Sequence, residues 1–178
     1  MKRIMVDLGK CTGCRTCEIV CSFERETVFN PKKSAIRVVK EELIGLDAPV
    51  VCQLCNHPKC VESCPEGALE KTLPLGVIKV KEEKCTGCRT CEEACPYGAL
   101  SMHPDRDIPI ICNLCDGKPA CVDWCHAKAL NFSSPRSSER AQSKRFKTAL
   151  TQYCQLMKKW EIPDLDERGN NHEKDRSL

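Results

Sequence analysis

The sequence has few aromatic residues and no long apolar segment. Aromatic side chains make up 4% of its 178 residues, and cysteine supplies part of the 41% hydrophobic fraction. A conventional core is therefore poorly supplied, and chains of this kind use disulfides or metals to stabilise the fold. No apolar run is long enough to span a membrane; the one at residues 108–112, for example, is short and contains Pro109.

Motifs of several other classes of protein are also missing. There is no glycine-rich phosphate loop, no flavin or nucleotide fingerprint and no acid–base constellation. Aromatic residues do not alternate with basic ones, so the formal net charge of +3 does not indicate nucleic-acid binding. The first residues contain neither a signal-peptide pattern nor a twin-arginine pair, so we expect a cytoplasmic protein with reduced thiols. We do not expect the chain to be catalytic by itself.

Cysteine, by contrast, is abundant and regularly spaced, because sixteen of the 17 cysteines form four quartets. The first and third quartets have the spacing C-x2-C-x2-C-x3-C, which is typical of bacterial-type ferredoxins, and the other two have a longer middle gap. The quartets are Cys11, Cys14, Cys17 and Cys21; Cys52, Cys55, Cys60 and Cys64; Cys85, Cys88, Cys91 and Cys95; and Cys112, Cys115, Cys121 and Cys125. This pattern predicts iron–sulfur clusters and therefore an electron carrier.

Zinc is the main alternative metal. Zinc sites usually join two C-x2-C pairs across a long loop, whereas three cysteines in one compact turn favour a four-iron cubane. The fourth quartet departs most from the pattern, because His126 stands where Pro65 and Pro96 follow the last cysteine of the second and third quartets. One site is therefore left open to zinc or a three-iron cluster. Cys154 lies outside the quartets, and we expect it to be a half-buried residue and not a ligand.

The quartets belong to a repeated unit. Residues 11–18 (CTGCRTCE) recur as residues 85–92, and CQLC at 52–55 corresponds to CNLC at 112–115. Strand-like runs at 4–6, 36–39 and 77–80 precede quartets, and short helices are expected at 16–23 and 90–94. We predict an α+β fold over residues 1–130, built from duplicated dicluster ferredoxin-like modules with short strands and helices around the clusters.

Residues 131–178 have a different composition. Serines and prolines at 133–138 suggest a linker, and an apolar stripe predicts an amphipathic helix that Pro163 would end. The stripe consists of Phe146, Ala149, Leu150, Tyr153, Met157 and Trp160. This helix either folds back on the cluster domain or docks a second subunit, and a charged polar tail follows it.

The four quartets resemble those of the four-cluster electron-transfer subunits of molybdenum- and tungsten-pterin oxidoreductases. The resemblance covers residues 2–130. Within that family, the segment through Cys21, with Asn30-Pro31 and residues 51–55, is most similar to the small subunits of tungsten aldehyde oxidoreductases and of the related benzoyl-coenzyme A reductases of obligate anaerobes.

The resemblance implies that the first quartet is interleaved with the fourth and the second with the third, so that paired quartets exchange their last cysteines. Site A would be Cys11, Cys14, Cys17 and Cys125. Site B would be Cys112, Cys115, Cys121 and Cys21. Site C would be Cys52, Cys55, Cys60 and Cys95. Site D would be Cys85, Cys88, Cys91 and Cys64.

The expected function is one-electron transfer through four [4Fe–4S] clusters. The expected partners are a large pterin-containing catalytic subunit and a soluble redox partner such as a ferredoxin or a flavin subunit. Alternatives within the same chemistry are a hydrogenase, formate dehydrogenase or carbon monoxide dehydrogenase system, or a free polyferredoxin. The alternative from another class is a zinc-binding structural module.

Overall fold

The computed structural model describes residues 1–42 and 45–134, which contain four antiparallel sheets of two strands each. The pairs are β1 (Arg3–Val6) with β8 (Leu130–Ser133), β2 (Ile36–Glu41) with β3 (Leu46–Val51), β4 (Leu69–Thr72) with β5 (Val77–Val80), and β6 (Ser101–Met102) with β7 (Pro109–Ile110). The helices are α1 (Thr16–Glu26), α2 (Lys59–Glu62), α3 (Thr90–Glu93) and α4 (Ala120–Asp123), with 3-10 turns at Leu8–Lys10, Pro31–Lys33, Glu82–Lys84 and Leu114–Gly117. The amphipathic helix expected near the C-terminus lies outside the described residues.

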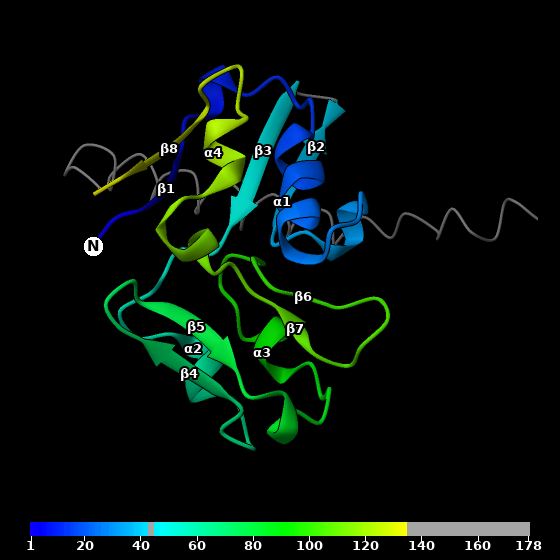
Figure 1. Cartoon of the computed structure of the whole chain (residues 1–178), viewed down its shortest axis with the longest axis vertical. Coiled ribbons are helices and arrows are strands. Elements are labelled where there is room, and N and C mark those ends of the chain that lie inside the picture. The colour runs from blue at the N-terminus through cyan, green and yellow to red at the C-terminus, as the bar shows by residue number, and fades with distance from the viewer. Residues whose placement is uncertain (43–44, 135–178) are drawn as a thin grey trace, which may run out of the picture. The chain divides into compact units, whose positions relative to one another are not determined.

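The two ends of the described segment lie together, and its middle forms a separate half (Figure 1). The first strand pairs with the last, and α1 contacts both α4 and β2. In the other half α2 contacts α3 and β4, while β4–β5 and β6–β7 are local hairpins. The chain therefore leaves the first half after β3, builds the second half, and returns to the first through α4 and β8.

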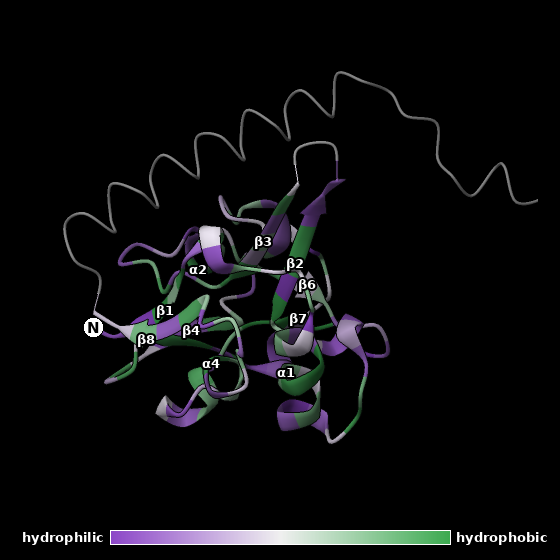
Figure 2. Ribbon diagram, turned by 90° about the horizontal axis from the view of Figure 1, so that it is seen from above, coloured by the Kyte–Doolittle hydropathy of each residue, from purple (hydrophilic) through white to green (hydrophobic). Residues whose placement is uncertain are grey.

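The core is small and rich in sulfur. Its aliphatic members include Ile4, Ile36 and Leu130, each at most 2% exposed. Seven buried cysteines belong to the same cluster of side chains: Cys17, Cys21, Cys52, Cys60, Cys91, Cys112 and Cys121. Among the described residues, no phenylalanine, tyrosine or tryptophan is fully buried. Figure 2 shows hydrophobic and hydrophilic residues alternating along β2 and α1, so apolar packing is confined to narrow faces.

The predicted α+β fold with short strands and helices is confirmed. The runs at 4–6, 36–39 and 77–80 lie in β1, β2 and β5, and α3 begins at Thr90 as expected. Helix α1 begins at Thr16 as expected but continues to Glu26, beyond the predicted end at 23. None of the described helices is long and apolar enough to cross a membrane.

Candidate iron–sulfur sites

The loops of the first and third quartets have the same backbone conformation. Gly13 and Gly87 are left-handed, with φ of 63° and 69°, and so are Arg15 and Arg89, with φ of 60° and 63°. Alternating left-handed residues turn successive backbone N–H groups toward one side of the chain, an arrangement found in many anion and iron–sulfur sites. The repeated sequence CTGCRTCE therefore produces the same concave loop twice.

The second and fourth quartets form a different loop, and again the two copies match. Leu54 and Leu114 are left-handed, with φ of 47° and 60°, and both are buried. Pro58 and Pro119 precede the short helices α2 and α4. The third cysteine of each of these quartets is buried on its helix. The leucine anchors the first half of each loop in the core, and the helix presents the third cysteine.

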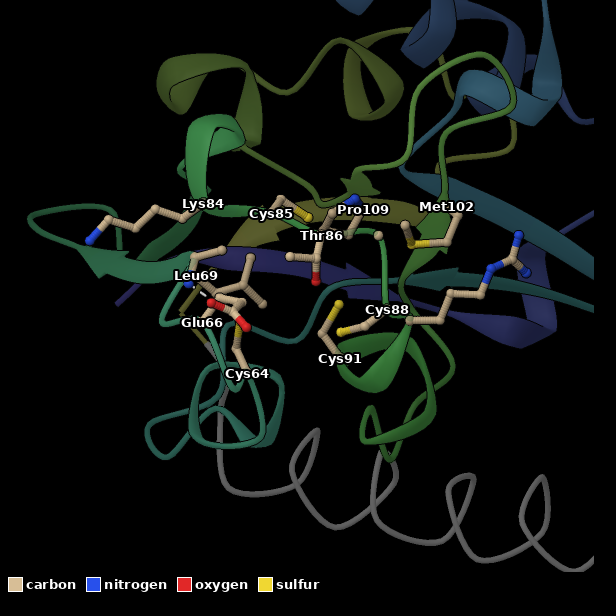
Figure 3. Close-up of a pocket in the computed structure, with 13 residues that line it drawn as sticks. Cys64, Glu66, Leu69, Lys84, Cys85, Thr86, Cys88, Cys91, Met102 and Pro109 are labelled. Carbon is tan, nitrogen blue, oxygen red and sulfur yellow. Dashed lines mark hydrogen bonds between the residues drawn. The ribbon is translucent and has the colours of Figure 1, made fainter.

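The structure brings the four cysteines of site D to one pocket (Figure 3). Cys64, Cys85, Cys88 and Cys91 all line it. The pocket has an empty volume of about 340 Å³, including space open to solvent, and Leu69 lies in its wall. Four thiols around an apolar space form a donor set suited to an iron–sulfur cluster.

The members of sites A, B and C also lie within electrostatic reach of one another. At site A, burial raises the pKa of Cys11, and the nearby Cys14 and Cys125 raise it further. At site B, burial raises the pKa of Cys121, and the other three members act in the same direction. At site C, burial raises the pKa of Cys60 to about 11, and the other three members again contribute. The structure thus brings together cysteines that are far apart in the sequence.

The buried thiols are poor thiolates without a metal. Burial is the main reason why the pKa of Cys17 and of Cys112 is raised to about 12. A bound iron cluster stabilises the deprotonated form, because the thiolate is the form that binds metal. In the described part of the chain, no three His, Cys, Asp or Glu side chains are arranged to hold a single metal ion. The sulfur-only donor sets and the site D pocket fit iron–sulfur clusters.

Backbone N–H groups donate hydrogen bonds to the last cysteine of three quartets. The Ala35 N–H lies 3.3 Å from Cys21 Sγ, and the Ala68 N–H lies 3.3 Å from Cys64 Sγ. In the same way, the Ala99 N–H lies 3.4 Å from Cys95 Sγ. Hydrogen bonds to ligand sulfurs stabilise the charged form and are one of the means by which proteins set cluster potentials.

Two of the quartet cysteines are exposed, Cys14 and Cys88. The Thr16 hydroxyl donates to Cys14 Sγ at 3.4 Å, and the Thr90 hydroxyl oxygen lies 3.4 Å from Cys88 Sγ. These hydroxyls are the main reason why the pKa of both thiols is lowered. Sequence analysis missed this role, although the matching Arg-Thr-Cys triplets in the two loops were a signal that could have revealed it.

The histidines show no common site. His57 and His126 are exposed, His103 is buried, and His172 lies outside the described residues. His103 Nε2 lies 2.6 Å from Glu26 Oε1, which also accepts a hydrogen bond from Arg106. No sequence spacing pointed to this charged group, because its members are far apart in the chain.

Comparisons with known proteins identify the class. The model of the 4Fe-4S dicluster domain matches residues 46–135, and that of a 4Fe-4S binding domain matches residues 8–24. The chain belongs to the 4Fe-4S dicluster family and is a multi-cluster iron–sulfur electron-transfer protein. The family resemblance and the electron-transfer function predicted from the sequence are confirmed.

Three relatives illustrate its place in that family. The polyferredoxin-like subunit of aliphatic sulfonate oxidoreductase from Pyrococcus furiosus is 40% identical over 123 residues, 69% of this chain and 70% of the relative. The electron transport protein HydN of Escherichia coli is 30% identical over 171 residues, covering 83% and 97%. The B subunit of the anaerobic dimethyl sulfoxide reductase of Escherichia coli is 31% identical over 147 residues, covering 71% and 70%.

Among solved structures, the chain is similar to one in the active site complex BamBC of benzoyl-coenzyme A reductase with bound benzoyl-CoA. The identity is 27%, the match covers 83% of this chain and 89% of that one, and the TM-score is 0.48.

Proposed function

We propose that the chain relays single electrons along a row of four [4Fe–4S] clusters between a pterin-containing catalytic subunit and a redox partner. The clusters supply reversible one-electron reduction, and the protein holds them, excludes water and sets their potentials. The observation that carries the proposal is the grouping of sixteen cysteines from distant segments into four sulfur-only sets, sites A to D. Each set takes three cysteines from one quartet and the fourth from the paired quartet.

The electrostatic neighbours of the cysteines suggest the order of the sites. Cys17 of site A raises the pKa of Cys121 of site B, although burial is the larger cause. Cys52 of site C acts in the same way on Cys112 of site B. Cys60 of site C acts on Cys91 of site D, again after burial. These contacts support the series A–B–C–D.

Exposure supports the same series. Each of sites A and D contains one exposed cysteine, Cys14 or Cys88, whereas the cysteines of sites B and C are buried or half-buried. The two exposed loops therefore stand at the ends of the row, where electrons enter and leave. Catalytic subunit and redox partner would each bind near one of them.

The relatives support the assignment of the partner. One belongs to an aliphatic sulfonate oxidoreductase and another to an anaerobic dimethyl sulfoxide reductase. By this similarity, and by the resemblance to subunits of pterin-dependent enzymes, we assign this chain to a complex with a molybdenum or tungsten catalytic subunit, of the aldehyde oxidoreductase or benzoyl-coenzyme A reductase type. HydN, described only as an electron transport protein, supports the second candidate, a carrier that works without a fixed catalytic partner.

The experiment that tests the clusters is the substitution Cys88→Ser. We expect iron and acid-labile sulfide to fall by about a quarter, since one of four cubic clusters loses a ligand, and partner reduction to slow. Anaerobic purification followed by metal and sulfide analysis measures the result. The matched control is Cys154→Ser, which should keep the full content. Unchanged iron in the Cys88 variant, or zinc in place of iron, would refute the assignment.

The partner is tested by isolating the native complex. A large subunit that co-purifies with molybdenum or tungsten supports the proposal. Recovery of the chain alone, brown and fully loaded with iron, favours the free polyferredoxin.

A further inference from the structure

Glu18 is a buried carboxylate beside site A. It follows Cys17 on α1 and is 5% exposed. Its Oε1 accepts a hydrogen bond from the Val38 N–H of β2 at 2.6 Å. Its Oε2 is buried and has no hydrogen-bond partner. Only one of the two carboxylate oxygens is therefore compensated by the protein.

No cation neutralises this carboxylate in an ion pair. The ion pairs found in the described part of the chain do not include Glu18. The nearby Arg15 is exposed, and Arg25 donates to the Ile111 carbonyl oxygen at 3.0 Å. A buried charge without a counterion acts strongly on its neighbours, because little solvent screens it.

Glu18 acts on a predicted ligand of site A. Burial is the largest cause of the raised pKa of Cys17, and the charge of Glu18 is the next. The field of the carboxylate therefore disfavours added negative charge at the sulfurs of this site. Reduction of a cluster adds one negative charge, so the same field disfavours reduction.

The equivalent residue at the other end of the row is placed differently. Glu92 follows Cys91 in the repeated sequence, but it is only half-buried. The reason lies in the elements that cover the two helices, because α1 packs against β2, whereas α3 packs against the short helix α2. Water screens Glu92 more than Glu18.

Other carboxylates do not create this difference. Asp47 packs against Gly13 in the loop of site A, and Asp107 packs against Gly87 in the loop of site D. Each end therefore carries one aspartate at the same place. Burial of the glutamate is the feature that distinguishes them.

We propose that Glu18 lowers the reduction potential of the cluster at site A and so makes this site the low-potential end of the row. The inference rests on the proposed function, because it assumes clusters at sites A and D. Electrons on the reduced row then collect away from the Cys14 loop, which favours their departure from the Cys88 loop.

The test is a redox titration of the purified holoprotein, followed by electron paramagnetic resonance, with Glu18→Gln. Glutamine keeps an acceptor for the Val38 N–H and removes the charge. We expect the equilibrium constant for reduction at site A to rise about tenfold, the size expected for a partly buried unit charge, which is about 59 mV for one electron. The site A signal is assigned as the one that Cys14→Ser alters, and the site D signal as the one that Cys88→Ser alters.

The matched control is Glu92→Gln, for which we expect a change of less than about twofold at site D, since its charge is screened. An unchanged site A potential in Glu18→Gln, or equal shifts in both variants, overturns the inference. If Glu18→Gln does not load clusters, Glu18→Met keeps the buried volume without the charge. Failure of both to load assigns Glu18 a purely structural role and also overturns it. Full iron and sulfide content with unshifted potentials contradicts only this inference, whereas missing clusters in the unaltered protein contradict the proposed function.

Discussion

At the scale of single residues, each ligand loop depends on close approach of a second segment. Gly87, in the loop of site D, has a φ of +69°, and a Cβ there would lie 2.7 Å from the Cβ of Asp107 and 3.1 Å from its carbonyl oxygen. Asp107 is in the segment between β6 and β7, and its carbonyl oxygen lies 3.6 Å from Cys85 Sγ. The missing side chain of Gly87 therefore lets the hairpin cover the cluster loop.

Substituting alanine for Gly87 should destabilise site D selectively. The left-handed conformation alone costs about 1–2 kcal/mol for a residue with a Cβ, and the contact with Asp107 adds to it because backbone cannot rotate away. We expect lower thermal stability and a loss of iron from one cluster, measured by metal analysis and by cluster absorbance on heating.

Gly98→Ala is the control, because Gly98 has a φ of +56° but no atom within 4 Å of its would-be Cβ. This variant should show the conformational cost with full iron content. Equal iron loss in both variants would contradict the role of the Asp107 contact.

At the scale of elements, the end of α1 is joined to the β6–β7 segment by a charged network. Glu26 accepts hydrogen bonds from His103 and Arg106 and pairs with Lys33 at 3.0 Å. Lys33 also pairs with Asp105 at 2.7 Å. Burial alone would raise the pKa of Glu26, but the bonds from Lys33 and His103 outweigh it and lower the pKa to about 2. The network connects the two halves of the described fold.

Glu26→Gln should therefore lower stability at neutral pH. The folded pKa of about 2 lies below the ordinary value of 4.5, so the unfolded state binds the proton first as the pH falls. The stabilisation by Glu26 is complete above about pH 4.5 and is lost toward pH 2. The difference between the two proteins should shrink over this range, in urea unfolding followed by circular dichroism from pH 7 downward.

Glu62→Gln is the control for this prediction. Glu62 pairs with Lys59 at 2.7 Å on an exposed helix, and exposed pairs of this kind contribute about 0–1 kcal/mol. A Glu26 variant that is as stable as the Glu62 variant at pH 7 would show that the network does not stabilise the fold.

Sequence patterns predicted the local elements better than their partners. The strands β1, β2 and β5 are rich in β-branched residues, and the left-handed Gly13 and Gly87 lie in the tight loops predicted around the clusters. The pairing of β1 with β8 and the network at Glu26 were not predictable, because they join residues more than 75 positions apart through contacts that leave no periodic pattern. The burial of Glu18, in contrast to Glu92, depends in the same way on β2, which covers only one of two identical motifs.

At the scale of the whole described fold, the first and last strands close one half. Ile4 in β1 is 1% exposed and pairs with Phe132 in β8. The same half carries sites A and B, whose proposed ligands come from both ends of residues 1–134. Sites C and D take all theirs from the middle. The strand pair therefore holds together the two segments that sites A and B share.

Ile4→Ala should weaken sites A and B before sites C and D. Truncation of a buried isoleucine costs about 2–5 kcal/mol, and here the loss falls on the β1–β8 pair. In a denaturant series, we expect the cluster signals of sites A and B to disappear at lower concentrations than in the unaltered protein. Val39→Ala is the control, since Val39 is 42% exposed. Loss of all four signals at one shifted concentration would show that the two halves unfold as a unit.

The interleaving of the quartets also has a consequence for biosynthesis. A ribosome delivers Cys11 first, yet the set to which we assign it is complete only when Cys125 has emerged. The sets at Cys52–Cys95 are complete thirty residues earlier on the nascent chain. Maturation factors therefore meet a chain whose middle is ready for iron while its beginning still waits for its end.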